Sequence, residues 1–305
     1  MGIFTENNGL CFVVEHAAIR NGAIAVLRGS NAPKEELDYI LGNCGAKALV
    51  VKDIKLLNNL KPYLNNHNLK FIIIMFNNSE NNYSDINCPV YDLEQVVEMG
   101  KTHIFVEPEQ NIDEPCLMLY TSGTTGYPKG VLITHKNILS QLPSFEDGFR
   151  SKAGEKTLQI LPVWHAYEHI AQIYYLTFGC HLHFSTLSGL KEDLINYDID
   201  TLMSVPRIWE AIRLGIFQNL KKKSVFLYKI FDFAVKLSIF YKIHKMYSER
   251  RITNKQNGYH ILSGLYHRAA RFFLKPIHIL SLNPLYSQIK KAAGIDFRAS
   301  ISGGG

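Results

Sequence analysis

Cysteines are few in this sequence, and their spacing matches neither a metal site nor a disulfide framework. Five cysteines are scattered over 305 residues without a CxxC pair. The N-terminal segment MGIFTENNGLCFVVEH lacks the basic region and apolar run of a secretory signal peptide. These absences favour a reduced compartment, so we expect a cytoplasmic protein, with membrane association as an open alternative.

The sequence also lacks an uninterrupted hydrophobic run long enough to span a membrane. The most apolar segment, residues 225–247, is interrupted by Lys229, Asp232, Lys236 and Lys242. A spanning helix needs about 20 nearly uncharged residues. We expect a packed core helix here; the alternative is an interfacial helix, basic on one side and aromatic on the other.

Negative charge is scarce in the last third of the chain. Residues 206–305 carry 18 Lys and Arg against 4 Asp and Glu, whereas residues 1–205 have a net charge of −8. A basic segment of this kind suggests an anionic partner, such as nucleotide phosphates or a lipid surface. No zinc-finger spacing or aromatic RNA-binding signature is present, so we expect no nucleic-acid partner.

Short apolar runs alternate with amphipathic stretches in the first half of the chain. Residues 46–51 and 70–76 have the composition of buried strands, and residues 53–64 have helical spacing with Asp53 as a plausible N-cap. This alternation predicts βαβ units and a largely parallel sheet. Further predicted strands are residues 115–122, 157–162, 181–186, 201–206 and 297–302. A helix is predicted over residues 134–142, and residues 207–295 are expected to be mostly helical.

The segment from Tyr120 to Gly130 carries the most specific chemical signal. It contains four Ser and Thr hydroxyls, three glycines and Lys129, directly after a predicted strand. Glycines allow the backbone to approach a ligand closely, and successive N–H groups can form an anion-binding concavity. The spacing is not that of a Walker A loop, because Pro128 stands where its second glycine should be. We therefore expect a polyphosphate-binding loop of another kind.

This string, YTSGTTGYPKG, resembles the phosphate-binding signature of the adenylate-forming (AMP-binding) superfamily. The supporting resemblances are residues 20–53, 161–169 (LPVWHAYEH), 204–212 (SVPRIWEAI) and 297–305 (FRASISGGG). Together they cover almost the whole chain and point to the branch of long-chain fatty-acid–CoA ligases and acyl carrier protein synthetases.

The resemblance implies a fold and a reaction. The fold would be α/β: a large N-terminal adenylation domain with parallel sheets flanked by helices, truncated at both ends. Residues 1–305 would form part of it, with a basic helical insertion at about 207–295 and no small C-terminal domain. The reaction would be ATP-dependent activation of a long-chain fatty acid to an acyl-adenylate, followed by transfer to the thiol of CoA or acyl carrier protein.

The resemblance also implies roles for individual residues. The phosphates of ATP would be held by Thr121, Ser122, Gly123, Thr124, Thr125, Gly126 and Lys129, with the Thr121 hydroxyl as a contact to Mg²⁺. His165 would lie near the acyl carboxylate and the α-phosphate. Gly303 and Gly304 would line the adenine.

Several family features are not found in this sequence. The motif whose Glu binds Mg²⁺, the Asp that binds the ribose hydroxyls and the catalytic Lys of the small domain have no counterpart. We therefore expect this chain alone to lack synthetase activity or to retain only a trace. The alternative is a non-catalytic remnant, or a nucleotide-binding half of a split synthetase.

A competing motif overlaps the segment at residues 161–169. His165, Glu168 and His169 match HxxEH, an inverted zinc-protease signature, in which two histidines on one helical face could bind zinc. The resemblance accounts for His165 and Glu168 without a metal. The family more often has Arg at position 169, so an ion pair at that position is open.

Overall fold

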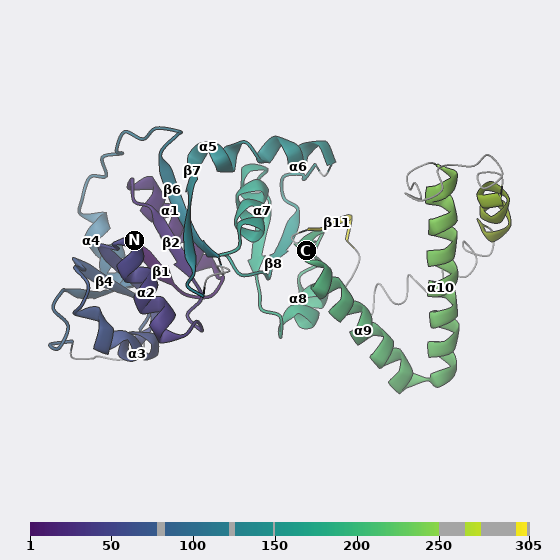
Figure 1. The fold of residues 1–305 in the computed structure, drawn as a ribbon, viewed down its shortest axis with the longest axis horizontal. Helices are drawn as coiled ribbons and strands as arrows, with labels where there is room; N and C mark the ends of the chain where they lie inside the picture. Colours follow the sequence, from purple (N-terminus) through teal and green to yellow (C-terminus); the bar gives the residue numbers. More distant parts are fainter. Residues whose placement is uncertain (78–82, 122–125, 149, 250–265, 276–296, 304–305) are drawn as a thin grey trace. The chain divides into compact units, whose positions relative to one another are not determined.

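The computed structural model describes residues 1–77, 83–121, 126–148, 150–249, 266–275 and 297–303 (Figure 1). These residues form two compact units. The first unit holds Met1–Leu190, Asp200–Ser204 and the segment that begins at Ala299; the second holds Lys191–Ile199 and Val205–Arg298.

A seven-stranded sheet organises the N-terminal part of the first unit. Its strand order is β5-β4-β3-β1-β2-β6-β7, and every neighbouring pair is parallel except β6 and β7. The strands are β1 Gly2–Phe4, β2 Ala25–Arg28, β3 Ala48–Asp53, β4 Phe71–Phe76, β5 Val90–Asp92, β6 Pro115–Thr121 and β7 Lys129–Thr134.

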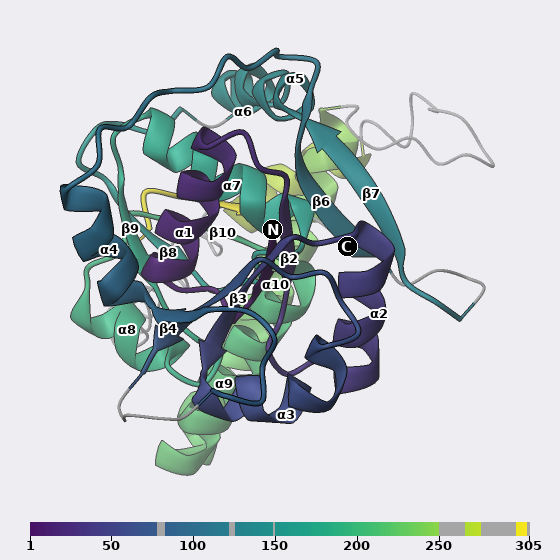
Figure 2. The same cartoon turned by 90° about the vertical axis from the view of Figure 1, so that its left-hand side faces the viewer.

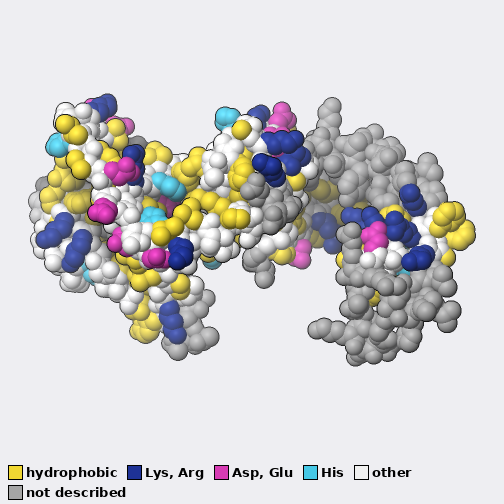
Figure 3. Space-filling view, turned by 90° about the horizontal axis from the view of Figure 1, so that it is seen from above, with side chains coloured by type: hydrophobic (Ala, Val, Ile, Leu, Met, Phe, Trp, Pro, Cys, Tyr) yellow, Lys and Arg dark blue, Asp and Glu magenta, His cyan; other side chains and the backbone are white. Residues whose placement is uncertain are grey.

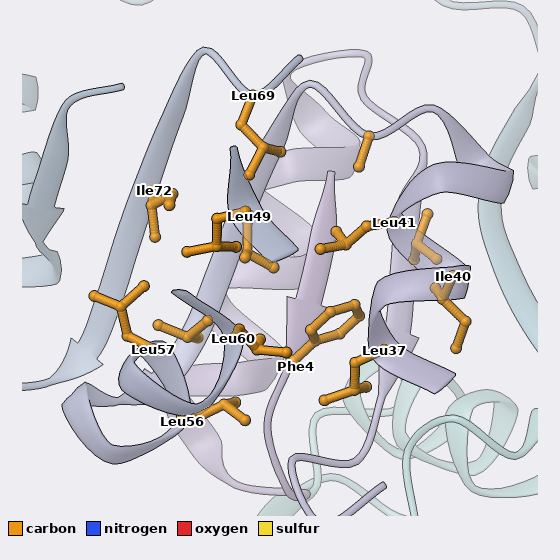
Figure 4. Close-up of a cluster of buried hydrophobic side chains, with 14 of the residues drawn as sticks. Phe4, Leu37, Ile40, Leu41, Leu49, Leu56, Leu57, Leu60, Leu69 and Ile72 are labelled. Atoms are coloured by element: carbon orange, nitrogen blue, oxygen red, sulfur yellow. The ribbon is translucent and has the colours of Figure 1, made fainter. Parts of the chain in front are cut away.

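Helices cover both faces of this sheet (Figure 2). Helices α1 (Gly9–Arg20) and α4 (Leu93–Lys101) pack on one face, and α2 (Lys34–Cys44) and α3 (Ile54–Leu64) pack on the other. Successive side chains of a strand point to opposite faces, so Ile3 joins the core beneath α1 and Phe4 joins the core beneath α2 and α3. Figure 4 shows this second core, with Phe4 beside Leu37 and Leu60.

A second sheet of four parallel strands completes the first unit. Its order is β11-β10-β8-β9. The strands are β8 Lys156–Gln159, β9 His181–Phe184, β10 Thr201–Ser204 and β11 Ala299–Ser302. Helix α7 (Ala166–Thr177) packs on this sheet through the fully buried side chains of Tyr174 and Tyr175. Helices α5 (His135–Leu139) and α6 (Leu142–Gly148) precede it in the chain, and α6 contacts α7.

The described residues of the second unit are mostly helical. It contains most of α8 (Leu190–Asn196), α9 (Pro206–Lys223), α10 (Val225–Ser248) and a helical segment at residues 266–275. Helix α10 packs along one stripe that includes Phe231 and Tyr241, whereas Phe226 and Phe233 are 71% and 66% exposed. The prediction that residues 225–247 form a packed core helix is therefore wrong for much of α10, because only one stripe of this helix is buried.

Most of the predicted elements are confirmed. The strands expected at 46–51 and 70–76 are β3 and β4, the later predicted strands correspond to β6, β8, β9, β10 and β11, and the sheets are largely parallel. The Asp53 side chain accepts a hydrogen bond from the backbone N–H of Leu56 at 2.8 Å, so it caps α3 as predicted. In the expected helical insertion, residues 250–265 and 276–296 lie outside the described residues, so its full extent stays a prediction.

The structure corrects one predicted helix and adds one strand. The helix expected over residues 134–142 begins at the predicted cap, Thr134, but α5 ends at Leu139 and α6 begins separately at Leu142. Strand β7 was not predicted, because its apolar residues stay largely exposed at the edge of the sheet and lack the signature of a buried strand.

Candidate functional site

The hydroxyl- and glycine-rich loop connects two antiparallel strands. Thr121 ends β6, Lys129 begins β7, and the two residues are direct partners in the ladder. Because opposed residues of a ladder project to the same face, both side chains rise from one face at the base of the loop. Ser122, Gly123, Thr124 and Thr125 lie outside the described residues.

Lys129 and Gly126 are both exposed to solvent. Within the described ranges, no carboxylate pairs with the exposed Lys129 ammonium. Gly126 has φ = +94°, a conformation that L side chains rarely adopt, although a Cβ there would meet no atom within 4 Å. The glycine is therefore required by the backbone conformation rather than by crowding.

A pocket of about 880 Å³ lies beside the loop. It forms at the carboxyl ends of β2 and β6, where ligands bind in open α/β sheets. Its lining includes Arg28, Glu36, Tyr39, Thr121, Gly126 and His165. The structure thus brings three sequence-predicted site residues, Thr121, Gly126 and His165, to one cavity of a size typical for small-molecule sites.

Arg28 supplies a fixed positive charge in the pocket wall. Its guanidinium forms an ion pair with Glu36 at 2.7 Å, and both side chains are partly buried. The same guanidinium lies 6.0 Å from the ring centroid of Trp164, within the range of a cation–π contact. The pocket therefore has an aromatic and charged wall on the side of β2.

His165 stands at the N-terminal cap position of α7 and faces the pocket. Burial, and next the positive charge of Arg28, lower the pKa of its imidazole below the usual value. The neutral ring is therefore favoured near neutral pH, and a neutral imidazole has one donor and one acceptor nitrogen. This chemistry suits a group that hydrogen-bonds to a ligand without adding charge.

Gly303 lies next to α7 but is not part of the pocket lining. Its backbone N–H donates to the carbonyl of Ser204 at 3.0 Å, and a Cβ on it would approach the ring of Tyr167 to 3.0 Å. Tyr167 follows His165 by two residues, so the segment after β11 is close to the first turn of α7. Gly304 lies outside the described residues.

Within the HxxEH motif, Glu168 and His169 contact different partners. The Glu168 carboxylate accepts hydrogen bonds from Asn7 at 3.0 Å and Gln172 at 3.2 Å. His169 places Nδ1 3.0 Å from Oε1 of Glu15. In the parts of the chain that are described, no three His, Cys, Asp or Glu side chains converge as metal ligands would. Position 169 therefore keeps a carboxylate partner although it holds His.

Sequence reasoning missed the residues that complete the pocket. Arg28, Glu36 and Tyr39 come from β2 and α2, far along the chain from the glycine-rich loop. The one local signal was an Arg followed by a Gly at the end of an apolar run, AVLRG. That pattern indicates a strand end but does not say what the Arg faces.

Comparison of the fold with solved structures identifies the class. The adenylation domain of the carboxylate reductase from Mycobacterium chelonae is similar, with a TM-score of 0.63 and 14% identity over 73% of this chain and 38% of that one. At this identity the likeness concerns the fold, which is that of adenylation domains.

Sequence comparison then identifies the family. The profile described as AMP-binding enzyme matches residues 1–251, so the chain belongs to that family. It is 28% identical to the Arabidopsis thaliana long-chain-fatty-acid–acyl-carrier-protein ligase AEE15, chloroplastic, over 100% of this chain and 44% of that protein. It is 25% identical to fatty acyl-CoA synthetase B of Dictyostelium discoideum, over 78% of this chain and 36% of that protein. The chain thus spans less than half the length of these relatives.

Proposed function

We propose that this chain provides the ATP-binding part of an acid–thiol ligase that activates long-chain fatty acids. The observation that carries the proposal is the pairing of Thr121 with Lys129 beside a pocket that also contains His165. Membership in the AMP-binding family and the names of its relatives support the same reaction class. The acyl group would pass to the thiol of CoA or of acyl carrier protein.

The residues around the loop fit a triphosphate with Mg²⁺. Lys129 is a cation without a described carboxylate partner, Thr121 offers a hydroxyl, and Gly126 gives the backbone a glycine-specific turn. Mg²⁺ is commonly held by substrate phosphates, waters and one or two protein carboxylates, and the Thr121 hydroxyl would add one protein oxygen here. Ser122, Gly123, Thr124 and Thr125 would add donors to the same phosphates. Bound Mg·ATP would supply the electrophilic α-phosphorus.

His165 would orient the reacting groups. Its neutral imidazole can donate one hydrogen bond to the acyl carboxylate or to an α-phosphate oxygen as charge develops there. Gly303 and Gly304 would line the adenine, as the family resemblance implies; Gly303 itself lies beside Tyr167, in the first turn of α7. Lys129 would thus contact the β- and γ-phosphates, and His165 would be near the α-phosphate.

Calorimetric titration with Mg·ATP tests the proposal. We expect saturable binding by the unchanged chain and a loss of at least about tenfold in affinity for Lys129→Ala, since a charge-assisted contact contributes more than a neutral one. Lys136→Ala is a matched control: this exposed lysine on α5 pairs with Asp113. A folded chain that does not bind Mg·ATP, or equal losses in the two variants, would contradict the proposal.

A second candidate is a nucleotide-binding half-protein or a non-catalytic remnant. The chain spans 44% of the ligase from Arabidopsis thaliana, so nucleotide binding by this chain and the full ligase reaction are tested separately. Release of pyrophosphate from ATP in the presence of a long-chain fatty acid separates the two. Binding of Mg·ATP without pyrophosphate release would support the nucleotide-binding half-protein.

The second unit is proposed to contact an anionic lipid surface. Lys221, Lys222 and Lys223 end α9, and exposed Phe226 and Phe233 follow on α10. Figure 3, seen from above, shows Lys and Arg side chains beside hydrophobic ones in its right-hand part, which holds the C-terminal end of α10 and the helical segment at residues 266–275. Among the described residues, no helix is both long and apolar enough to cross a bilayer. The proposed contact is therefore interfacial.

Sedimentation with lipid vesicles tests the lipid contact. We expect binding to vesicles that contain anionic lipid, weakened by salt and by simultaneous replacement of Lys221, Lys222 and Lys223 with Ala. Vesicles of zwitterionic lipid alone are the control. Equal binding to both kinds of vesicle, or no binding to either, would contradict the contact; retention by an acidic carrier protein instead would identify the alternative partner.

A further inference from the structure

Two fully buried ionisable side chains join α1 to α7 outside the pocket. Glu15 of α1 is 0% exposed and His169 of α7 is 2% exposed. The Nδ1 atom of His169 lies 3.0 Å from Oε1 of Glu15. Neither Glu15 nor His169 lines the pocket.

The surroundings of Glu15 make His169 its necessary partner. Neither carboxylate oxygen of Glu15 has an aligned hydrogen-bond partner among the described residues, and Nδ1 of His169, 3.0 Å away, is the polar group in contact with it. Burial, and then the Glu15 charge, raise the pKa of the Cys116 thiol on β6 to about 11. An uncompensated charge at such a depth is costly. The pair therefore holds α7 at one position relative to α1.

The neighbouring residue of α7 is fixed by a second set of contacts. Asn7, just before α1, donates through Nδ2 to Oε1 of Glu168 at 3.0 Å and to the carbonyl of Leu161 at 2.8 Å. Gln172 donates to the Asn7 amide oxygen at 3.0 Å and to Glu168 at 3.2 Å. Adjacent residues of an α-helix project about 100° apart, so contacts at Glu168 and His169 together prevent α7 from rotating about its axis.

These contacts act on the turn of the helix that begins with His165. The backbone N–H of His169 donates to the carbonyl of His165 at 3.2 Å, which closes the first turn. Any rotation or shift of that turn would move the imidazole of His165 along the pocket wall. We propose that Glu15 and His169 form a positioning pair that keeps the His165 imidazole directed into the pocket, an inference that rests on the role proposed for His165 above.

The test separates positioning from stability. Replacing both partners with apolar side chains of similar size, Glu15→Leu with His169→Leu, leaves no unpaired buried charge, so the chain should remain folded. Histidines labelled with ¹³C at Cε1 report on His165 by NMR, with its signal assigned from a His165→Gln variant. In the double variant we expect the His165 signal to shift or broaden and the affinity for Mg·ATP to fall at least fivefold.

Two further variants provide the controls. His169→Asn keeps a donor near the position of Nδ1 and should restore most of the His165 signal. Asp38→Asn weakens another carboxylate–histidine contact, 2.6 Å between Asp38 and His67, and should leave the His165 signal unchanged. If the His165 signal is the same in the double-Leu variant as in the unchanged chain, the positioning pair is refuted. If the unchanged chain fails to bind Mg·ATP, the proposed function is refuted, while the NMR comparison still decides the positioning pair.

Discussion

The indole of Trp164 lies against Gly29, at the point where β2 ends and the pocket begins. A Cβ on Gly29 would stand 2.8 Å from Cζ2 of the indole, closer than side chains approach one another. Trp164 directly precedes His165, and Gly29 directly follows Arg28. The absence of a side chain at position 29 therefore determines where the segment entering α7 meets the seven-stranded sheet.

Substitution of this glycine should disturb both stability and the site. We expect Gly29→Ala to displace Trp164 and to lower the free energy of unfolding by about 1–3 kcal/mol, the usual cost of overpacking. Affinity for Mg·ATP should fall as well, because His165 moves with Trp164. Urea denaturation followed by indole fluorescence measures the first effect, in a Trp209→Phe background that leaves Trp164 as the only tryptophan.

A helical glycine provides the control for that experiment. A Cβ on Gly100, within α4, would meet no atom within 4 Å. Gly100→Ala should be neutral or stabilise the chain by up to about 1 kcal/mol. A Gly29→Ala variant that behaves like Gly100→Ala would show that Trp164 has room to move and that the contact does not position His165.

Gly126 and Gly154 offer a comparison of two glycines under the same constraint. Both have positive φ, +94° and +83°, and neither would have a neighbour within 4 Å of an added Cβ. Alanine should therefore cost about 1–2 kcal/mol of stability at each position. Only Gly126→Ala should also weaken binding of Mg·ATP by calorimetry, because Gly126 lines the pocket. Equal effects of the two substitutions on binding would argue against a phosphate contact by this loop.

Strands and helices with strong local signals were predictable from the sequence. Residues 70–76 are nearly all apolar and β-branched or aromatic, and they form the buried strand β4. Thr134 and Asp53 were predictable as caps because their side chains satisfy N–H groups two or three residues ahead. Strand β7 was not predictable in the same way, since its stability comes from pairing with β6 rather than from burial of its own residues.

The site was predictable only where its residues are adjacent in the sequence. The string from Thr121 to Lys129 carries its own chemistry, but nothing local to Arg28 predicts that its guanidinium pairs with Glu36 and covers Trp164. The contact between Glu15 and His169 likewise depends on how α1 and α7 are packed. Such contacts are set by tertiary structure, which a periodic pattern of hydrophobic residues does not specify.

Removal of the cap at Asp53 should destabilise α3. The Asp53 carboxylate accepts a hydrogen bond from Leu56 N–H, and α3 buries Leu57 and Leu60 in the core beneath it. We expect Asp53→Ala to lower the free energy of unfolding by about 1 kcal/mol. Asp53→Asn should have nearly the free energy of unfolding of the unchanged chain, because Asn also accepts that hydrogen bond. Thermal denaturation monitored by circular dichroism measures the difference. Equal melting temperatures for the two variants would contradict the capping role.

Glu168 should give the chain a distinct dependence of stability on pH. Burial raises the pKa of its carboxyl to about 8, and this outweighs the hydrogen bonds from Gln172 and Asn7 that favour the charged form. A glutamate in the unfolded chain titrates near pH 4.3, about its usual value. Between these two values the native chain holds a proton that the unfolded chain has released, so stability falls as the pH rises through this window and levels off above it.

The neutral isostere isolates this effect. The Gln side chain of Glu168→Gln can accept the same two hydrogen bonds and does not titrate. Between pH 5 and pH 8.5 the free energy of unfolding should therefore fall by about 3–5 kcal/mol more in the unchanged chain than in this variant. Urea denaturation at the two pH values measures the difference, with Glu94→Gln, an exposed carboxyl on α4, as the control. If the unchanged chain and the Glu168→Gln variant lose the same free energy over this range, the buried carboxyl is already ionised in the native state, and the amides of Asn7 and Gln172 outweigh the cost of its burial.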